Sequence, residues 1–176
     1  MSNIFFTADT HFSHHNMALL RGFSSAEEHD EILIQNINNM ITRQDILYIL
    51  GDMCWKNTYD VFYNRINCKN IHLILGNHDK PNLKNKKLFA SVSQIKNIKL
   101  DTAFISMCHF PIACWDHSHW GSWHLHGHTH GQFVGSGKCY DAGVDNNNLK
   151  PISFDDVRSI MRILKDNNNL KTNIYF

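Results

Sequence analysis

Three short apolar runs of the chain each end in side chains that can bind a metal ion. The runs are 4–8, 46–50 and 71–75, and the residues that follow them include Asp9, His11, Asp52, Asn77, His78 and Asp79. Runs of this length that are rich in β-formers are typical of strands buried on both faces. Ligands of open α/β sheets bind beyond the carboxyl ends of the strands. We therefore expect the three runs to bring these side chains to one rim, where carboxylates and imidazoles could hold metal.

The carboxylate and the imidazole of the first motif stand two residues apart. In an extended segment Asp9 and His11 would point to the same side, so one ion could bind both. A turn aspartate next to an exposed histidine gives the same pattern, and this motif alone leaves both interpretations open. Asp52 is a stronger indication of a metal site, because a buried carboxylate at a strand end is costly unless it is paired or bound to metal.

Histidine is also dense later in the chain. A fourth apolar run, 103–108, ends at His109, and the stretch 124–130 holds His124, His126, His128 and His130. Strand alternation would place these last four on one side. We expect at least two of them to bind metal, and we interpret His124 and His126 as supporting or packing residues. The sequence assigns no role to His14, His117 or His119.

Composition narrows the class of protein. The chain has 176 residues and a formal net charge of +1. This length favours one domain over 1–176, and the charge gives no global reason to expect DNA or an acidic membrane as partner. The five cysteines are odd in number and form no C-x-x-C pair, which favours a reducing compartment over a disulfide framework. No apolar run approaches ~18 residues and no signal-like start is present, so we expect a cytoplasmic protein without a membrane span.

The order of the predicted elements indicates a parallel arrangement. Strands at 3–8, 46–50 and 71–75 alternate with helices at about 24–42 and 57–66. This β-α-β-α-β pattern implies parallel neighbours joined by right-handed crossovers. The first helix has Ser24 or Ser25 as its N-cap and acidic residues in its first turn.

The remaining segments are less regular. Strands are expected at 103–108, at 138–142 and around Val144, followed by a capped helix over 153–165 and a tail that could pair as a strand. The lysine-rich stretch 80–100 could attract a phosphorylated ligand, but such runs are more often a solvated face. His29, on the first predicted helix, is expected at the surface.

Five motifs resemble those of the calcineurin-like metallophosphoesterase superfamily in type and in order. They are Asp9-x-His11, Gly51-Asp52, Gly76-Asn77-His78-Asp79, His109 and Gly127-His128-x-His130. Val144-Asp145 with Lys150-Pro151 is similar to the tail of the small bacterial and phage members. The resemblance implies an α/β fold, a four-layer α-β-β-α sandwich with two mixed β-sheets and a metal site at the carboxyl ends of the strands.

The resemblance also implies a dinuclear metal centre. One divalent transition metal ion (Mn, Fe, Zn or Ni) would be bound by Asp9, His11 and His130, and a second by Asn77, His109 and His128, with Asp52 bridging the two. The implied activity is a phosphoesterase in which a metal-bridging hydroxide attacks a small phosphodiester or nucleotide. His78 would face the scissile group and stabilise charge or protonate the leaving oxygen. Asp79 could orient His78 or hold the loop, and we favour the loop.

One departure narrows the substrate. The protein-phosphatase branch has an acidic residue at the position of Trp55, so a phosphoprotein substrate is not expected. The implied partner is a small phosphorylated or nucleotide substrate, contacted by His15, Asn16 and Trp115. Trp115, Trp120 and Trp123 could form an apolar wall for a base or ring, or they could only cover the edge of a small core. The alternatives are a metal-dependent nuclease, although no extended nucleic-acid surface is evident, and a non-catalytic adaptor that keeps the fold. The oligomeric state stays open.

Overall fold

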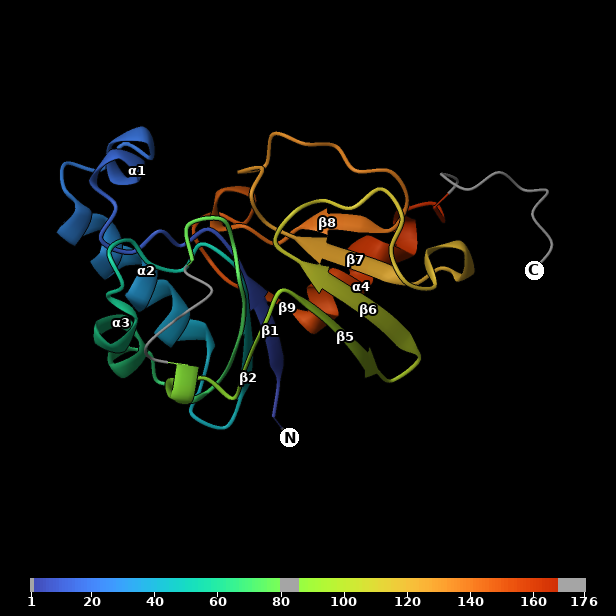
Figure 1. The fold of residues 1–176 in the computed structure, drawn as a ribbon, viewed down its shortest axis with the longest axis horizontal. Coiled ribbons are helices and arrows are strands. Elements are labelled where there is room, and N and C mark those ends of the chain that lie inside the picture. Colours follow the sequence, from blue (N-terminus) through green and yellow to red (C-terminus); the bar gives the residue numbers. More distant parts are fainter. Residues whose placement is uncertain (1, 80–85, 168–176) are drawn as a thin grey trace.

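The computed structural model describes residues 2–79 and 86–167, which form two β-sheets packed face to face with helices around them (Figure 1). The first sheet has the strand order β4-β3-β2-β1-β9. Its strands are β1 (Ile4–Thr7), β2 (Ile46–Leu50), β3 (Asn70–Ile74), β4 (Ser91–Ser93) and β9 (Ile152–Ser153). All neighbours in it are parallel except β1 and β9. The predicted parallel β-α-β-α-β arrangement is confirmed.

The second sheet has the strand order β5-β6-β7-β8. Its strands are β5 (Ile95–Leu100), β6 (Ala103–Cys108), β7 (Trp123–His126) and β8 (Cys139–Asp141). The pair β5–β6 is antiparallel, whereas β6–β7 and β7–β8 are parallel. Both sheets are therefore mixed, and the predicted α/β sandwich class is confirmed.

Helices flank the sheets. They are α1 (His15–Leu20), α2 (Ala26–Met40), α3 (Tyr59–Arg65) and α4 (Phe154–Ile163), with short 3-10 turns η1 (Lys86–Leu88), η2 (Ser118–Trp120) and η3 (Val144–Asn146). The serine N-caps expected for the two longer helices are present. Ser25 accepts a hydrogen bond from the backbone N–H of Glu28, and Ser153 accepts one from that of Asp156. Among the described helices, none is long and apolar enough to span a bilayer.

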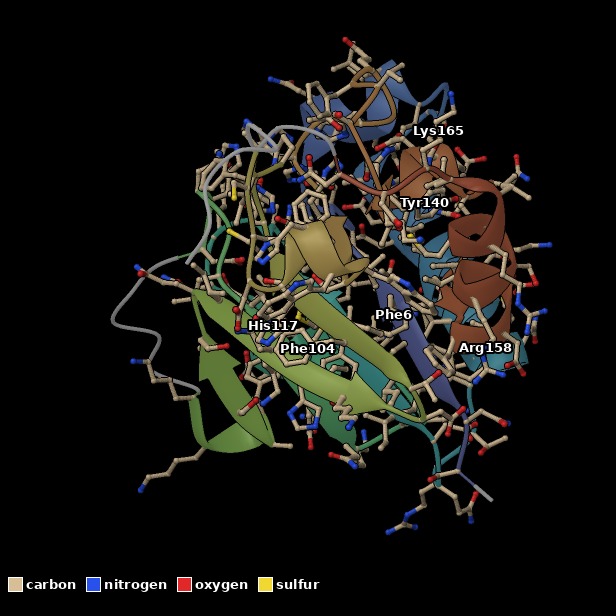
Figure 2. All side chains as sticks on the ribbon, turned by 90° about the vertical axis from the view of Figure 1, so that its right-hand side faces the viewer. Phe6, Phe104, His117, Tyr140, Arg158 and Lys165 are labelled. Carbon is tan, nitrogen blue, oxygen red and sulfur yellow. The ribbon has the colours of Figure 1, made fainter. Side chains whose placement is uncertain are left out.

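Strand alternation in the first sheet divides the core in two. Phe5, Leu47 and Ile49 face α2 and α3 on the outer side of the sheet. Phe6 and Leu50 face the opposite way, into the space between the sheets, and Figure 2 shows Phe6 there between β6 and α4. Residues of β6, β7 and α4 complete this second cluster, so the two sheets and α4 share one apolar layer.

Several expectations about single segments were wrong. The segment around Val144 was expected to be a strand, but it forms the 3-10 turn η3. His29 is fully buried instead of exposed, because Arg21 and Asp30 surround its ring. The lysine-rich stretch contains the strands β4 and β5, and β5 alternates exposed and half-buried residues, as a solvated edge strand does. Lys80, Lys84 and the expected tail strand lie outside the described residues.

Candidate metal centre

The carboxyl ends of β1, β2 and β3 lie side by side, and the loops that follow them are tied together. The backbone N–H of Asp9 donates to the carbonyl of Gly51 at 3.0 Å, and that of His11 donates to the carbonyl of Asp52 at 2.9 Å. Because the three strands are parallel neighbours, their loops emerge at one edge of the sheet. The single rim expected from the sequence is therefore present.

Asp52 lies at the centre of the cluster. Its Oδ2 is 3.4 Å from Nε2 of His109, 3.8 Å from Nε2 of His11 and 3.9 Å from Nε2 of His78. Its other oxygen accepts a hydrogen bond from the backbone N–H of His78 at 2.9 Å. This carboxylate therefore lies beside imidazoles that come from three separate loops.

One group of side chains that could hold an ion consists of Asp9, His11 and His130, whose ligand atoms all lie within 4.8 Å of one another. The rings of His11 and His130 stack with centroids 5.4 Å apart. Nδ1 of His130 donates to Oδ2 of Asp145 at 2.6 Å, so Nε2 is left for a metal. This group is the set that the resemblance assigned to the first ion.

The residues assigned to the second ion also come together. Nε2 of His109 is 3.0 Å from Oδ1 of Asn77, and the His109 and His128 rings are in edge contact at 5.1 Å. Nδ1 of His109 donates to the carbonyl of Leu50 at 2.8 Å, which turns Nε2 toward the cluster. Asp9, Asp52 and His109 form a further group with metal-ligand spacing, so Asp9 lies close to His130 and His11 and also to His109.

The backbone of the site is left-handed at an unusual number of positions. Five of the seven predicted ligands have positive φ: Asp9, His11, Asp52, His128 and His130. A left-handed L-residue costs about 1–2 kcal/mol, so the surrounding hydrogen bonds must hold these turns. Strand alternation therefore does not explain the pairs two residues apart, because β1 ends at Thr7 and β7 ends at His126. Asp9 and His11 lie in one group, as the first motif predicted, but tight turns bring them there. The four later histidines do not share one side: His130 stacks on His11, His128 contacts His109, and His124 and His126 are buried.

Two glycines allow the loops to approach. A Cβ on Gly76 would lie 2.1 Å from Oδ1 of Asp52, and one on Gly51, whose φ is +96°, would lie 2.3 Å from Nδ1 of His109. No side chain fits at those distances. Only glycine therefore fits at the two positions that precede Asp52 and Asn77 in their motifs.

The cluster fits a divalent cation on its own chemistry. Oδ1 of Asp9 and Nε2 of His11 are buried, lack a hydrogen-bond partner and stand 4.0 Å apart. Buried polar atoms are normally paired, and a cation between this carboxylate oxygen and this imidazole nitrogen would pair both. Burial raises the pKa of Asp9 to about 7 and lowers the pKa of His11 to about 3. A bound cation would favour the ionised carboxylate and the neutral imidazole, which are the metal-binding forms.

The pKa values of Asp52 and His109, at the centre of the cluster, shift in the opposite directions to those of Asp9 and His11. Burial acts to raise the pKa of Asp52, but its contacts with His109 and the other imidazoles hold that pKa below the usual value. Burial likewise acts to lower the pKa of His109, and the neighbouring Asp52 carboxylate raises it above the usual value. Asp52 is thus held in its ionised form, which is the form that binds metal.

Sequence reasoning missed several residues that hold the site together. Asp145, noted in the sequence only as part of a tail motif, contacts both His130 and Arg21. Asp141 accepts hydrogen bonds from the hydroxyl of Thr129 and the backbone N–H of Gly131, on either side of His130. These partners lie far from their targets in the sequence, and no local pattern marks them.

The aromatic residues at the rim are not those expected. Trp55 packs against the rings of His14 and His78, with centroids 4.3 and 5.3 Å away, and Phe110 packs against His128 at 4.7 Å. Trp115 is instead buried against His124, to which it stacks at 5.2 Å. Trp115, which was expected to contact substrate, therefore covers the second sheet.

The other expected contacts and unassigned histidines are also placed. His15 and Asn16 are exposed at the start of α1, and no contact with the cluster is found for them among the described residues. His117 and His119 pack on Trp120, and His117 also packs on Phe104 near the amino end of β6, away from His109. His124 and His126 are buried and hydrogen-bonded to backbone carbonyls.

The blocks that carry the resemblance meet at one rim of a sandwich of two mixed sheets, which is the arrangement that the resemblance to the calcineurin-like metallophosphoesterases implied. The chain is 30% identical over 167 residues to the uncharacterized protein MJ1445 of Methanocaldococcus jannaschii, covering 88% of this chain and 89% of that protein. It belongs to the same family as that protein.

Two further proteins are similar. The gene 66 protein of Mycobacterium phage L5 is 27% identical over 168 residues, covering 76% of this chain and 80% of that protein. The crystal structure of the protein of unknown function AQ665 from Aquifex aeolicus superposes with a TM-score of 0.74 at 24% identity, covering 91% of this chain and all of that chain. This last likeness supports the fold. No protein-family model matches the chain.

Proposed function

We propose that this protein is a dinuclear metal-dependent phosphohydrolase that cleaves a small phosphodiester or nucleotide. The observation that carries the proposal is the position of Asp52, whose Oδ2 lies 3.4–3.9 Å from three imidazoles contributed by three different loops. Around it stand two groups of ligand-type side chains, and two buried polar atoms in the first of them have no hydrogen-bond partner. A purely structural role explains none of these features.

The residues divide between two ions. Asp9, His11 and His130 would hold one, Asn77, His109 and His128 would hold the other, and Asp52 would serve both. When bound, two divalent ions activate a water molecule and neutralise charge on the phosphoryl group. Imidazole, carboxylate and amide ligands without thiolate suit Mn, Fe or Zn.

His78 is the candidate for proton transfer to the leaving group. Its side chain is 38% exposed, whereas those of His11 and His109 are 4% and 0% exposed. His78 thus borders the cluster on its open side, where a substrate would enter. Its backbone is fixed by the hydrogen bond to Asp52, so the ring is held next to the reaction centre. Imidazole can donate a proton near neutral pH.

The rim favours a small substrate that carries a ring. Trp55 lies against His78, and Phe110 lies against His128, so aromatic surface borders the polar cluster at two points. The indole occupies the position where the protein-phosphatase branch has an acidic residue. A base or aryl group next to the phosphate could pack on this surface, with stacking worth about 1–3 kcal/mol.

Metal removal tests the proposal. Chelation should abolish hydrolysis of an activated aryl phosphodiester, and added Mn²⁺ or Zn²⁺ should restore it. Asp52→Asn should lower the metal content more than Asn77→Ala, because Asp52 contacts both groups and Asn77 only one. Asp116→Asn, which changes an exposed carboxylate that pairs with His117, is the control and should behave as wild type. Undiminished turnover in fully metal-free protein would refute the proposal, and equal metal content in Asp52→Asn and wild type would refute the bridging role.

A further inference from the structure

A buried ion pair adjoins the candidate metal centre and has no part in the scheme above. Arg21 follows α1, and Asp145 lies in η3. Nε of Arg21 donates to Oδ1 of Asp145 at 2.8 Å, and Nη2 donates to Oδ2 at 2.6 Å. The side chains are only 5% and 19% exposed. Such a two-bond pair is geometrically strict, and burying it adds little stability over an apolar pair of similar size. Its geometry, more than its contribution to stability, needs an explanation.

The guanidinium of Arg21 also holds the loop that carries Asp9. Nη2 donates to the carbonyl of Asp9 at 2.7 Å, and Nη1 donates to the carbonyl of Thr10 at 3.4 Å. These contacts fall on a turn in which Asp9 has a left-handed backbone. Arg21 therefore stabilises a strained segment that delivers two predicted ligands.

Asp145 completes the link on the other side. Its Oδ2 accepts a hydrogen bond from Nδ1 of His130 at 2.6 Å, as well as the one from Arg21. Because Nδ1 carries the proton, the lone pair of His130 is on Nε2, which is the nitrogen left to bind an ion together with Asp9 and His11. His109 differs in that its Nδ1 donates to a neutral carbonyl. A carboxylate partner raises the basicity of a ligating imidazole and fixes its ring.

On the basis of the proposed function, we propose that Arg21 and Asp145 are positioning residues specific to one of the two metal sites, the one formed by Asp9, His11 and His130. Asp145 sets the tautomer and the direction of the His130 ring. Arg21 holds Asp145 and the Asp9 loop at a fixed separation. The site of Asn77, His109 and His128 has no contact with this pair among the described residues.

Metal titration of the full chain tests the site specificity. We expect Asp145→Ala to weaken one of the two Mn²⁺ or Co²⁺ binding steps by about 10- to 100-fold, the usual effect of removing such a partner, and to leave the other step unchanged. The Co²⁺ absorption spectrum of the weakened site should change, since its histidine is no longer fixed. Arg21→Lys keeps the charge but loses the fork, and should weaken the same step by less.

Thr129→Val is the matched control. Thr129 is adjacent to His130, and its hydroxyl donates a hydrogen bond to the carboxylate of Asp141 at 2.6 Å. The variant removes this bond and leaves Nδ1 of His130 paired with Asp145. Asp141 keeps the backbone N–H groups of Gly131 and Gly143 as donors. The variant loosens the loop that carries both His128 and His130, so we expect its loss of affinity to fall on both binding steps alike and not on one of them. Equal weakening of both steps in Asp145→Ala, or weakening of a single step in Thr129→Val, would overturn the proposal in favour of general loop stabilisation.

A second measurement needs neither metal nor turnover. Long-range proton–nitrogen NMR of the metal-free protein at alkaline pH reports which ring nitrogen of His130 carries the proton. We expect Nδ1–H in wild type and in Arg21→Lys, and a shift toward Nε2–H in Asp145→Ala. An Nδ1–H tautomer that persists in Asp145→Ala would overturn the positioning role, and Arg21→Lys tests it if Asp145→Ala does not fold. Absence of any phosphoester hydrolysis by metal-loaded wild type would refute the proposed function alone, because neither measurement depends on turnover.

Discussion

The carboxylate of Asp79 accepts a hydrogen bond from the backbone N–H of Asp52 at 2.7 Å. The same oxygen accepts one from the backbone N–H of Gly76 at 2.8 Å, so Asp79 joins the loops after β2 and β3. Its second oxygen accepts a hydrogen bond from the hydroxyl of Tyr59 at 2.6 Å. Asp79 therefore holds the loop, as expected from the sequence, and makes no described contact with the ring of His78. The distance between Asp52 and His78 depends on this buried carboxylate.

Tyr59→Phe should measure how much this anchoring contributes. The variant removes one hydrogen bond to a buried carboxyl group, and we expect the free energy of unfolding to fall by about 1.5–3 kcal/mol. Chemical denaturation of the metal-free protein gives this value. Tyr63→Phe, on the same helix, loses a 3.2 Å hydrogen bond at the surface and should change stability by less than about 0.5 kcal/mol. Equal losses in the two variants would contradict an anchoring role for Asp79.

The sequence predicted the buried strands well because burial leaves a continuous apolar run. The predicted strands 46–50 and 103–108 coincide with β2 and β6. The edge strand β5 was missed. Every second residue of it is exposed and it contains Lys96 and Lys99, so its sequence resembles that of a solvated loop. Pairing with β6 along its whole length, and not its own pattern, makes it a strand.

The candidate site was predictable only to the level of its ligands. Each motif is local, so Asp9, Asp52 and His109 could be named from residue type and position at strand ends. Their partners could not, because Arg21, which follows α1, and Asp145, in η3, meet only in the folded chain. The burial of His29, which contacts Arg21, likewise depends on the folded chain. Tertiary contacts of this kind leave no periodic signal in one sequence.

A pH-dependent contribution to stability should come from His124. Burial, opposed by its hydrogen bond to the Ser106 carbonyl, lowers the pKa of His124 to about 4 from 6.5. Nδ1 donates to that carbonyl at 3.0 Å, and Nε2 lies 3.1 Å from the backbone nitrogen of Ile112 and 3.3 Å from the carbonyl oxygen of Phe110. The Ile112 N–H can donate to Nε2 only while the ring is neutral. Protonation therefore favours the unfolded chain. The stability is fully present above pH 6.5 and is lost as the pH falls from 6.5 toward 4.

The expected loss from His124 alone is about 2 kcal/mol between pH 7.5 and pH 5. Other buried histidines titrate as well, so the measurement is the difference between wild type and His124→Gln. Denaturation at several pH values should show a shallower decline for the variant, even if the variant is less stable at neutral pH. Parallel curves for the two proteins would show that His124 does not titrate on unfolding.

The last prediction separates His78 from the metal ligands. If His78 acts on the leaving group, His78→Ala should keep its fold and its metal content, because none of the seven ligand positions is changed. The rate should fall by about 10²- to 10⁴-fold, the usual contribution of a positioned acid–base group. The loss should be larger for an alkyl ester, whose leaving oxygen needs a proton, than for a nitrophenyl ester, which departs unaided. A purely electrostatic role would slow both esters by similar factors.

The measurement is kcat/KM of wild type and variant on both esters, with metal content determined in each sample. Loss of metal from the variant would make His78 a ligand. Retained metal with equal slowing of both esters would leave charge stabilisation, and not proton donation, as its role.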